Sequence, residues 1–256
     1  RELSRINPLA FAALHGLDDE AVIVAFLRAA HFGLFDLGWN VVCPGCGGVL
    51  GEGESLKTIH HDQYLCAMCA GGYECSLDDM VEVTFTVSRR VRRIAGHSPD
   101  ELPLAEYLRQ VFWASAMDLP DDLAHEIDEM TLDTLELPAH EKAQLSLQIP
   151  AGFLIVFDPV SHAAQFIDVQ GEPTRERQNL SVTFTQLQAP STTVEMRPGP
   201  LRLSLENRTG ERVLPGVWIA GDRLHELLGR RRAYLSAKRL LSNQVFRDLY
   251  GAELLD

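Results

Sequence analysis

The chain has 256 residues, of which 46% are hydrophobic and 23% charged, as is usual for a globular protein with a substantial core. Its formal net charge of −13 is the wrong sign for a phosphate backbone, so we expect no nucleic-acid partner. No apolar run approaches the roughly 20 residues that span a bilayer, so we expect no membrane insertion.

Residues 1–38 are predicted to be helical. Asp18 is a candidate N-cap, and Asp19 and Glu20 follow in the first turn, where the helix dipole favours acids. One apolar face with helical spacing then comprises Val22, Ile23, Phe26, Leu27, Ala30 and Leu34. This segment is therefore expected to pack one side of its helix against a core.

Residues 39–80 contain two Cys-x-x-Cys pairs, which are the most specific motif in the chain. The first pair is Cys43 and Cys46, and the second, after 19 intervening residues, is Cys66 and Cys69. Four thiolates in this spacing are typical of a zinc ribbon, in which one Zn²⁺ is held in a tetrahedron. We expect one structural zinc per chain, with no open position for a substrate or water.

Other interpretations of the cysteines remain open at this point. A redox dithiol normally begins a helix, whereas Gly47 and Gly48 follow the first pair. A disulfide framework needs an oxidising compartment, and the chain shows no signal segment and has Cys75 left over. His60 or His61 could replace one sulfur, and Lys57 could offset the negative charge of the centre.

Residues 81–143 are predicted to form a strand followed by acidic helices. The alternation over residues 81–87 indicates a half-buried strand. A small basic cluster follows, which we interpret as a solvated strand end, although it could contact phosphate; it comprises Arg89, Arg90, Arg92 and Arg93. Residues 99–136 are expected to be helical. Within them Glu126 and Glu129 could share one helix face, as a carboxylate metal site or a surface for a basic partner would require.

Residues 144–220 are predicted to form an antiparallel β-sandwich. Seven short runs of strand-forming residues are separated by Pro, Gly, Asn or Asp at the spacing of such folds; they are 145–149, 152–157, 163–169, 180–185, 192–196, 201–205 and 213–220. Alternating apolar positions predict core residues, and these are Phe153, Ile155, Phe157, Leu201, Leu203 and Leu205.

Residues 221–256 are predicted to return to helix. Asp222 is expected to cap a helix that runs to Leu228 and ends at Gly229. Ser242 is expected to cap a second helix over residues 243–250, with Gly251 as its stop. The complete prediction is an α+β protein with five parts, which are 1–38, 39–80, 81–143, 144–220 and 221–256.

Motifs of common catalytic sites are missing from the sequence. It contains no Gly-x-Ser-x-Gly elbow, no phosphate-binding loop, no Gly-x-Gly-x-x-Gly and no His-Glu-x-x-His. Asp158, Ser161 and His162 are the residue types of a catalytic triad, but neighbours in sequence rarely have triad geometry. We expect no catalytic residue and no enzymatic activity in this chain.

Several stretches together carry a family resemblance. They are Gly33-Leu34-Phe35 with Trp39-Asn40, the two cysteine pairs, residues 81–85 leading to Val91-Arg92, and residues 240–250, which include Phe246-Arg247-Asp248-Leu249. In these stretches the chain resembles the N-terminal domain of unknown function that precedes the catalytic domain in a group of bacterial class III adenylate/guanylate cyclases. The resemblance spans nearly the whole chain.

The resemblance implies a role in cyclic nucleotide signalling. Cys43, Cys46, Cys66 and Cys69 would be the zinc ligands, and the helix over residues 246–249 would connect to a downstream cyclase domain in the same polypeptide. The metal-binding aspartates of that domain find no match here, and the chain opens at Arg1 without an initiator Met, so we expect a fragment or a processed product. We expect a cytoplasmic regulatory module that could form a homodimer, with an effector that the sequence does not identify.

Two functions of other classes remain as alternatives. The first is a zinc-ribbon interaction scaffold whose acidic helix docks a basic partner. The second is a thiol or zinc sensor in which loss of the metal is the signal.

Overall fold

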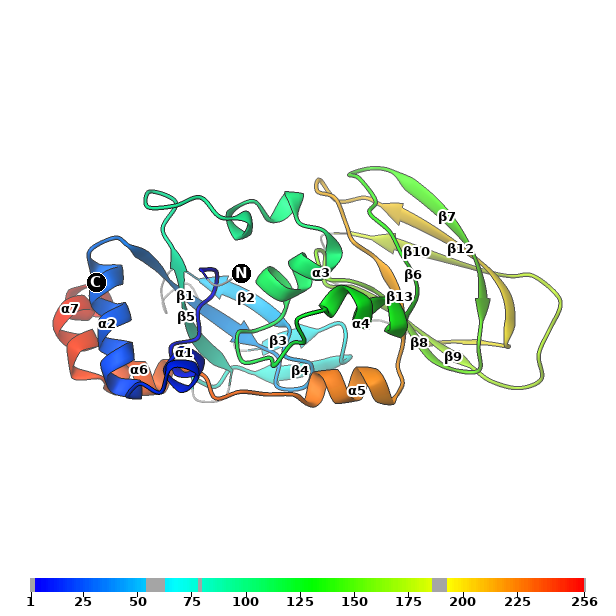
Figure 1. Cartoon of the computed structure of the whole chain (residues 1–256). Helices are drawn as coiled ribbons and strands as arrows, with labels where there is room; N and C mark the ends of the chain where they lie inside the picture. The colour runs from blue at the N-terminus through cyan, green and yellow to red at the C-terminus, as the bar shows by residue number, and fades with distance from the viewer. Residues whose placement is uncertain (1–2, 54–62, 78–79, 186–192, 256) are drawn as a thin grey trace. The chain divides into compact units, whose positions relative to one another are not determined.

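The computed structural model describes residues 3–53, 63–77, 80–185 and 193–255, and it confirms the α+β class. The chain divides into two compact units (Figure 1). Unit 1 comprises residues 1–65, 72–118 and 230–256, and unit 2 comprises residues 66–71 and 119–229. Within the described ranges, no helix combines the length and the apolar character needed to cross a membrane.

Unit 1 is built on a three-stranded antiparallel sheet in the order β2-β1-β5. Its strands are β1 (Phe35–Val42), β2 (Val49–Gly53) and β5 (Val81–Val87). Helices α1 (Pro8–His15) and α2 (Asp19–His31) precede the sheet, and Asn7 and Asp18 cap them by accepting backbone N–H bonds. The predicted helix face is confirmed up to Ala30, but the helix ends at His31 and a strand begins at Phe35. Leu34, predicted to lie on this face, is 46% exposed and lies outside the helix, so its prediction is wrong.

The last two helices pack on the same core as the sheet. They are α6 (Ala237–Ser242) and α7 (Gln244–Leu255), and Figure 1 shows α7 beside α2. The core includes Leu27, Phe85, Leu240 and Phe246. The prediction that Ser242 caps the last helix is wrong. Ser236 caps α6, and the side chain of Asn243 accepts the N–H of Phe246 at 3.1 Å. The last helix also continues through Gly251.

Strand β5 is buried on both faces, whereas its alternating sequence predicts a solvent face. Glu82 and Thr84 are 0% and 1% exposed. The Glu82 carboxylate accepts bonds from Asn40 at 3.2 Å and from the backbone and hydroxyl of Ser115 at 3.2 and 2.9 Å. Burial raises the pKa of Glu82, and the nearby charge of Arg5 partly opposes this rise. A polar strand face therefore indicates solvent only where no other segment covers it.

The segment predicted as acidic helices is more irregular than expected. It contains two short 3-10 turns (Ala95–His97 and Pro99–Glu101), α3 (Leu104–Tyr107), a π-helical turn (Leu108–Phe112) and α4 (Leu123–Met130). Residues 131–134 are not helical but form strand β6 (Thr131–Thr134), which joins the larger sheet of unit 2. Helix α5 (Asp222–Gly229) closes unit 2 and includes the glycine that was predicted to end it.

Unit 2 contains two sheets with one core between them, as the predicted sandwich requires. All seven predicted strands are present: β7 (Lys142–Ile149), β8 (Gly152–Asp158), β9 (Ala163–Val169), β10 (Gln178–Phe184), β11 (Thr193–Met196), β12 (Gly199–Asn207) and β13 (Gly216–Ile219). They form a sheet in the order β10-β12-β7 and another in the order β11-β9-β8-β13-β6. The common core draws on both sheets, with Leu147 and Leu203 from the first and Leu154 and Ile167 from the second.

Two strand pairs in unit 2 are parallel, which the antiparallel prediction did not include. They are β10 with β12 and β11 with β9. From β9 to β12 the chain alternates between the two sheets, so each strand lies beside the next but one and runs in the same direction. A parallel pair needs a crossover connection, and here the intervening strand of the opposite sheet provides it.

The predicted core positions of β8 are only partly correct. Leu154 and Val156 face the sandwich interior with 0% exposure. Ile155 and Phe157 are also buried, on the opposite face of the strand, while Phe153 is 37% exposed and stacks on Phe166. The predicted interior positions of β12, at Leu201, Leu203 and Leu205, are confirmed.

We predict that Glu82 makes unit 1 less stable as pH rises. A carboxyl with a raised folded-state pKa contributes its full stability below its unfolded pKa of about 4.3, and that contribution is lost as pH rises through the raised value. Glu82→Gln removes this titration, so the unfolding free energy of the variant minus that of the wild type should increase with pH. Each unit of pKa elevation corresponds to about 1.4 kcal/mol.

Denaturant unfolding between about pH 5 and about pH 8 measures this difference. Glu172→Gln, at an exposed loop position, is the matched control for the substitution itself. A difference for Glu82→Gln that stays constant with pH would contradict the prediction.

Candidate metal centre

The first cysteine pair lies in the turn between β1 and β2. Val41 and Val42 end β1 with a register shift, and residues 43–48, here called knuckle 1, follow directly. The N–H of Cys43 donates to the carbonyl of Gly48 at 2.8 Å, and the N–H of Gly47 donates to the carbonyl of Cys43 at 2.9 Å. The N–H of Gly48 lies 3.4 Å from the sulfur of Cys46 and donates to it. Backbone hydrogen bonds therefore close the turn, and one of them is donated to the sulfur of Cys46.

The second cysteine pair lies in the turn of another hairpin. Strands β3 (Gln63–Cys66) and β4 (Gly71–Glu74) pair with each other, and residues 66–70, here called knuckle 2, connect them. The two knuckles share one backbone feature, because the residue after the second cysteine is left-handed in both. Gly47 has φ +73° and Ala70 has φ +50°. Glycine adopts this conformation without strain, whereas alanine does so at a cost of about 1–2 kcal/mol.

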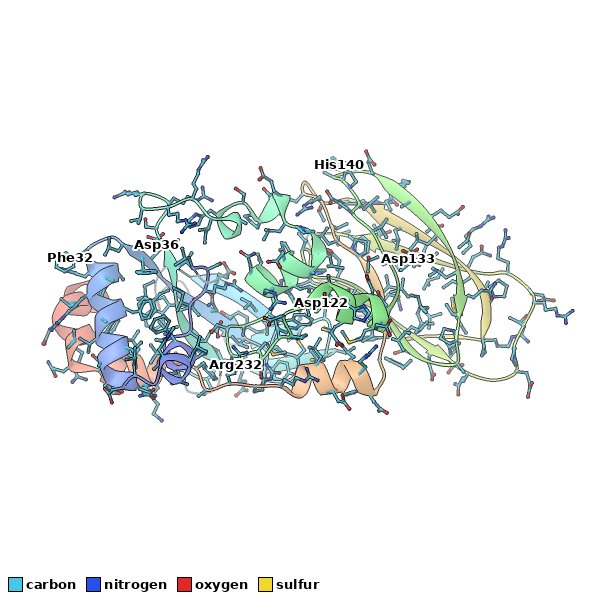
Figure 2. The ribbon with its side chains drawn as sticks, viewed as in Figure 1. Phe32, Asp36, Asp122, Asp133, His140 and Arg232 are labelled. Carbon is cyan, nitrogen blue, oxygen red and sulfur yellow. The ribbon has the colours of Figure 1, made fainter. Side chains whose placement is uncertain are left out.

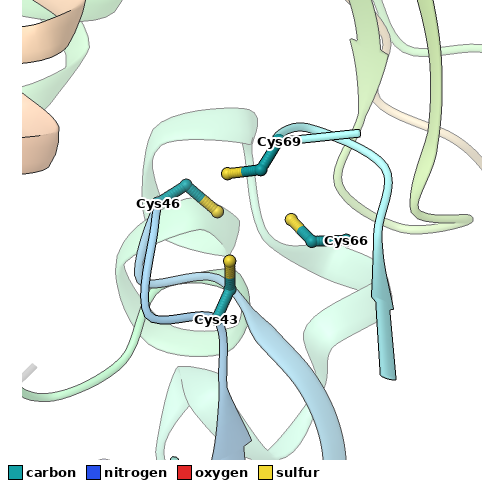
Figure 3. Close-up of side chains that lie close together, drawn as sticks. All are labelled: Cys43, Cys46, Cys66 and Cys69. Carbon is teal, nitrogen blue, oxygen red and sulfur yellow. The ribbon is translucent and has the colours of Figure 1, made fainter. Parts of the chain in front are cut away.

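The four cysteine sulfurs converge on one point (Figure 3). Their Sγ atoms all lie within 4.8 Å of one another. A tetrahedral ion with metal–sulfur bonds of about 2.3 Å places its sulfurs about 3.8 Å apart, so a small contraction of this cluster would hold one ion. Cys43, Cys46 and Cys66 are buried, and Cys69 is exposed. All four cysteines predicted as ligands thus lie in one cluster, and four thiolates are enough to fill a tetrahedral coordination shell.

The sequence offered four other candidate residues near this centre, and none of them is part of the described cluster. His60, His61 and Lys57 lie outside the described residues. Cys75 is not a member of the four-sulfur cluster but is half-buried against the core of unit 1, where burial raises the pKa of its thiol.

Arg231 is a residue at the centre that sequence reasoning missed. Its Nη2 donates to the carbonyl of Gly45 at 2.8 Å, although 186 positions separate the two residues. A Cβ placed on Gly47 would lie 2.1 Å from Nη1 of Arg231, so the guanidinium lies directly against knuckle 1. A divalent ion with four thiolates carries net negative charge, which a nearby cation offsets. The sequence around Arg231 shows only the basic run Arg230-Arg231-Arg232, which does not indicate that Arg231 contacts Gly45.

Knuckle 1 rests on residues 112–117, which also belong to unit 1. Gly48 forms an isolated antiparallel bridge with Trp113, and the N–H of Ala114 donates to the carbonyl of Gly47 at 2.8 Å. A Cβ on Gly48 would lie 2.6 Å from the ring of Phe112, so the backbone of the turn contacts that ring directly. Packing against this ring therefore favours glycine at position 48, and the positive φ angle favours glycine at position 47.

The acidic pair on α4 shares one helix face, as expected, but a guanidinium occupies that face. Nη1 of Arg223 lies 2.8 Å from Glu129, and Nε lies 3.7 Å from Glu126. Both carboxylates thus share one guanidinium within unit 2. The basic cluster after β5 is exposed, and its Arg89 side chain donates to the carbonyl of His97.

Asp158, Ser161 and His162 do not have triad connectivity. The hydroxyl of Ser161 donates directly to the Asp158 carboxylate at 2.5 Å, and the N–H groups of Ser161 and Leu214 donate to the same carboxylate, each at 2.7 Å. In a triad the histidine stands between serine and aspartate. Burial raises the pKa of Asp158 and lowers the pKa of His162 to about 4. The carboxylate thus serves to order the turn after β8.

Comparisons with known proteins give one match. The model of a family described as a family of unknown function (DUF5939) matches residues 1–248. No curated protein and no solved structure matches the chain.

We predict that Gly47→Ala destabilises unit 1 by about 1–2 kcal/mol, mainly through left-handed strain, because the atoms that its Cβ would meet are the ends of two flexible side chains that can move aside. The added Cβ would meet Arg231 at 2.1 Å and the sulfur of Met117 at 2.4 Å. Gly72→Ala in the neighbouring hairpin is the control, because its Cβ would lie 3.4 Å from Leu65, an ordinary contact. It should change stability by less than about 0.5 kcal/mol. Denaturant unfolding measures both variants, and equal effects would contradict the role assigned to Gly47.

Proposed function

The chain belongs to the family of unknown function DUF5939, and from this premise we propose that it is a zinc-stabilised regulatory module without catalytic activity of its own. In this proposal it acts on the catalytic domain of a class III adenylate/guanylate cyclase in the same polypeptide. The link to cyclases rests on the resemblance described above. A cytoplasmic location and a homodimeric state are part of the same proposal, and its effector is not identified.

The chemistry of the donor set supports zinc as the metal. Four thiolates in a tetrahedron suit Zn²⁺, which has no geometric preference of its own and no redox chemistry. When bound, the ion would supply cross-linking of two hairpins rather than a reacting centre. Cys43 and Cys46 would hold it from knuckle 1, and Cys66 and Cys69 from knuckle 2. A shell filled by protein ligands leaves no position for substrate, which supports a structural role.

The position of α7 is the observation that carries the regulatory proposal. This helix contains the stretch Phe246–Leu249, which in the resembling proteins lies shortly before the catalytic domain. Phe246 is 2% exposed, and its ring centroid lies 6.1 Å from that of Trp39 in β1 and 5.2 Å from that of Tyr250. The helix is thus an integral part of the core of unit 1.

Polar contacts tie the same region to α2. The hydroxyl of Tyr250 donates to the carbonyl of Leu27 at 3.2 Å. Arg239, in α6, lies 2.7 Å from Glu20, and the side chain of Asn243 donates to Glu20 at 3.1 Å. A rearrangement of the core would therefore move α7, and a ligand that prefers one arrangement would shift its population. This is how the module would bias a domain that follows it.

The scaffold alternative has less support. A docking site for a basic partner needs carboxylates available to that partner, whereas Glu126 and Glu129 already surround Arg223. The sensor alternative is compatible with a zinc centre whose ligand Cys69 is exposed.

We predict that Phe246→Ala changes nucleotide-cyclising activity in the full-length polypeptide. The substitution opens a cavity under α7 and should lower the unfolding free energy of unit 1 by about 3–5 kcal/mol. If α7 transmits the bias, activity or dimerisation should change by about fivefold or more, the scale of a typical allosteric coupling. Asp248→Asn, at an exposed position of the same helix, is the control and should leave activity unchanged.

A variant that lacks residues 1–240 tests the same proposal without depending on the folding of unit 1. Its activity or dimerisation should also differ from that of the full-length polypeptide. Unchanged activity and dimerisation across conditions in this variant would overturn the regulatory proposal, and the absence of cyclase activity from the full-length polypeptide would overturn the assignment to a cyclase.

A further inference from the structure

Two short segments of unit 1 form the way into and out of residues 119–229. The chain leaves unit 1 at Asp118 and returns to it at Arg230. We call residues 116–118 and 230–232 the connector pair. Both segments belong to unit 1, although more than a hundred residues separate them in the sequence.

The connector pair is held together as a short antiparallel ladder. The N–H of Asp118 donates to the carbonyl of Arg230 at 3.0 Å, and the N–H of Arg232 donates to the carbonyl of Ala116 at 2.7 Å. Met117 and Arg231 form the bridge between them. The side chain of Arg232, labelled in Figure 2, adds an ion pair with Asp118. An isolated ladder of this length is only marginally stable in water, so it depends on its surroundings.

Knuckle 1 provides those surroundings. The two central residues of the ladder, Met117 and Arg231, are the two that pack against Gly47. Arg231 also donates to the carbonyl of Gly45, and Ala114, just before the ladder, donates to the carbonyl of Gly47. Every one of these contacts is made to backbone between or beside the ligands Cys43 and Cys46. The conformation of knuckle 1 and the closure of the ladder are therefore coupled.

We propose that the metal centre keeps the two segments of the connector pair together, and we call this role the clasp. Metal bound by Cys43 and Cys46 holds residues 43–48 in the conformation that Arg231, Met117 and Ala114 contact, and loss of the metal releases the ladder. Arg231 is the positioning residue that joins the two. By linkage, a ligand that binds only the closed arrangement stabilises that arrangement. The inference rests on the proposed metal centre and adds a regulatory step. Metal occupancy would control the stability of the ladder between residues 116–118 and 230–232.

Native-state hydrogen exchange on the full chain tests the clasp. The protein is compared with one equivalent of Zn²⁺ and after removal of the ion by a chelator. The amides of Ala114, Asp118 and Arg232 should exchange about tenfold or more faster without the metal, which corresponds to about 1.4 kcal/mol. The amide of Asn207 in unit 2, which donates to Glu141 at 2.9 Å, and the amide of Val83, which donates to Leu235 at 2.8 Å, are the references and should not change.

Arg231→Ala tests the clasp without removing the metal, because all four cysteines remain. The same connector amides should exchange faster with Zn²⁺ still bound, and Arg231→Lys should restore part of the protection. Arg230→Ala is the matched control, since Arg230 enters the ladder through its backbone carbonyl and its side chain is exposed.

The outcomes separate the two proposals. Failure of the wild-type chain to bind Zn²⁺ would overturn the metal centre, and the clasp with it. Bound Zn²⁺ with unchanged connector amides in Arg231→Ala would overturn the clasp alone. If chelation also speeds exchange of the Val83 amide, the metal stabilises unit 1 as a whole. Faster exchange of the connector amides alone in Arg231→Ala would then support the clasp, and unchanged exchange would overturn it.

Discussion

The convergence of four sulfurs is the constraint on which both knuckles, and the segments packed against knuckle 1, depend. It requires two hairpin turns, each with a left-handed residue after its second cysteine, to close toward one point. In knuckle 1 that residue is Gly47, which packs against Arg231 and Met117. Four thiolates brought this close repel one another unless a cation lies between them, so this geometry is the one that a bound metal ion would stabilise.

The sequence predicted those parts of the protein that local patterns control. Two Cys-x-x-Cys pairs indicate a metal site because both spacing and ligand chemistry are local. Strands β7 to β13, seven of the eight described in the two sheets of unit 2, follow from alternation and turn residues. The same patterns gave wrong or no predictions where contacts with distant segments determine burial and strand pairing. Glu82 alternates as a solvent-facing residue but is covered by residues from elsewhere, the parallel pairing of β10 with β12 needs a crossover through the other sheet, and Arg231 reaches Gly45 across 186 positions.

The proposed regulatory function needs a region that responds and a region that reports. In this protein α7 is packed into the core of unit 1 through Phe246, and the path into residues 119–229 is packed against knuckle 1. Both therefore belong to one folded body, unit 1. Asp158 and Ser161, two residues of the triad types that the sequence contains, instead order a turn.

X-ray absorption at the zinc edge, on protein purified and then loaded with Zn²⁺, tests the central claim most directly. The account predicts one zinc per chain surrounded by four sulfur atoms at about 2.3 Å, with no oxygen or nitrogen ligand. Cys69→Ser should replace one sulfur by a lighter scatterer, whereas Cys75→Ser should leave the spectrum unchanged. A first shell containing nitrogen or oxygen in the wild-type protein, or a chain that binds no zinc, would contradict the account.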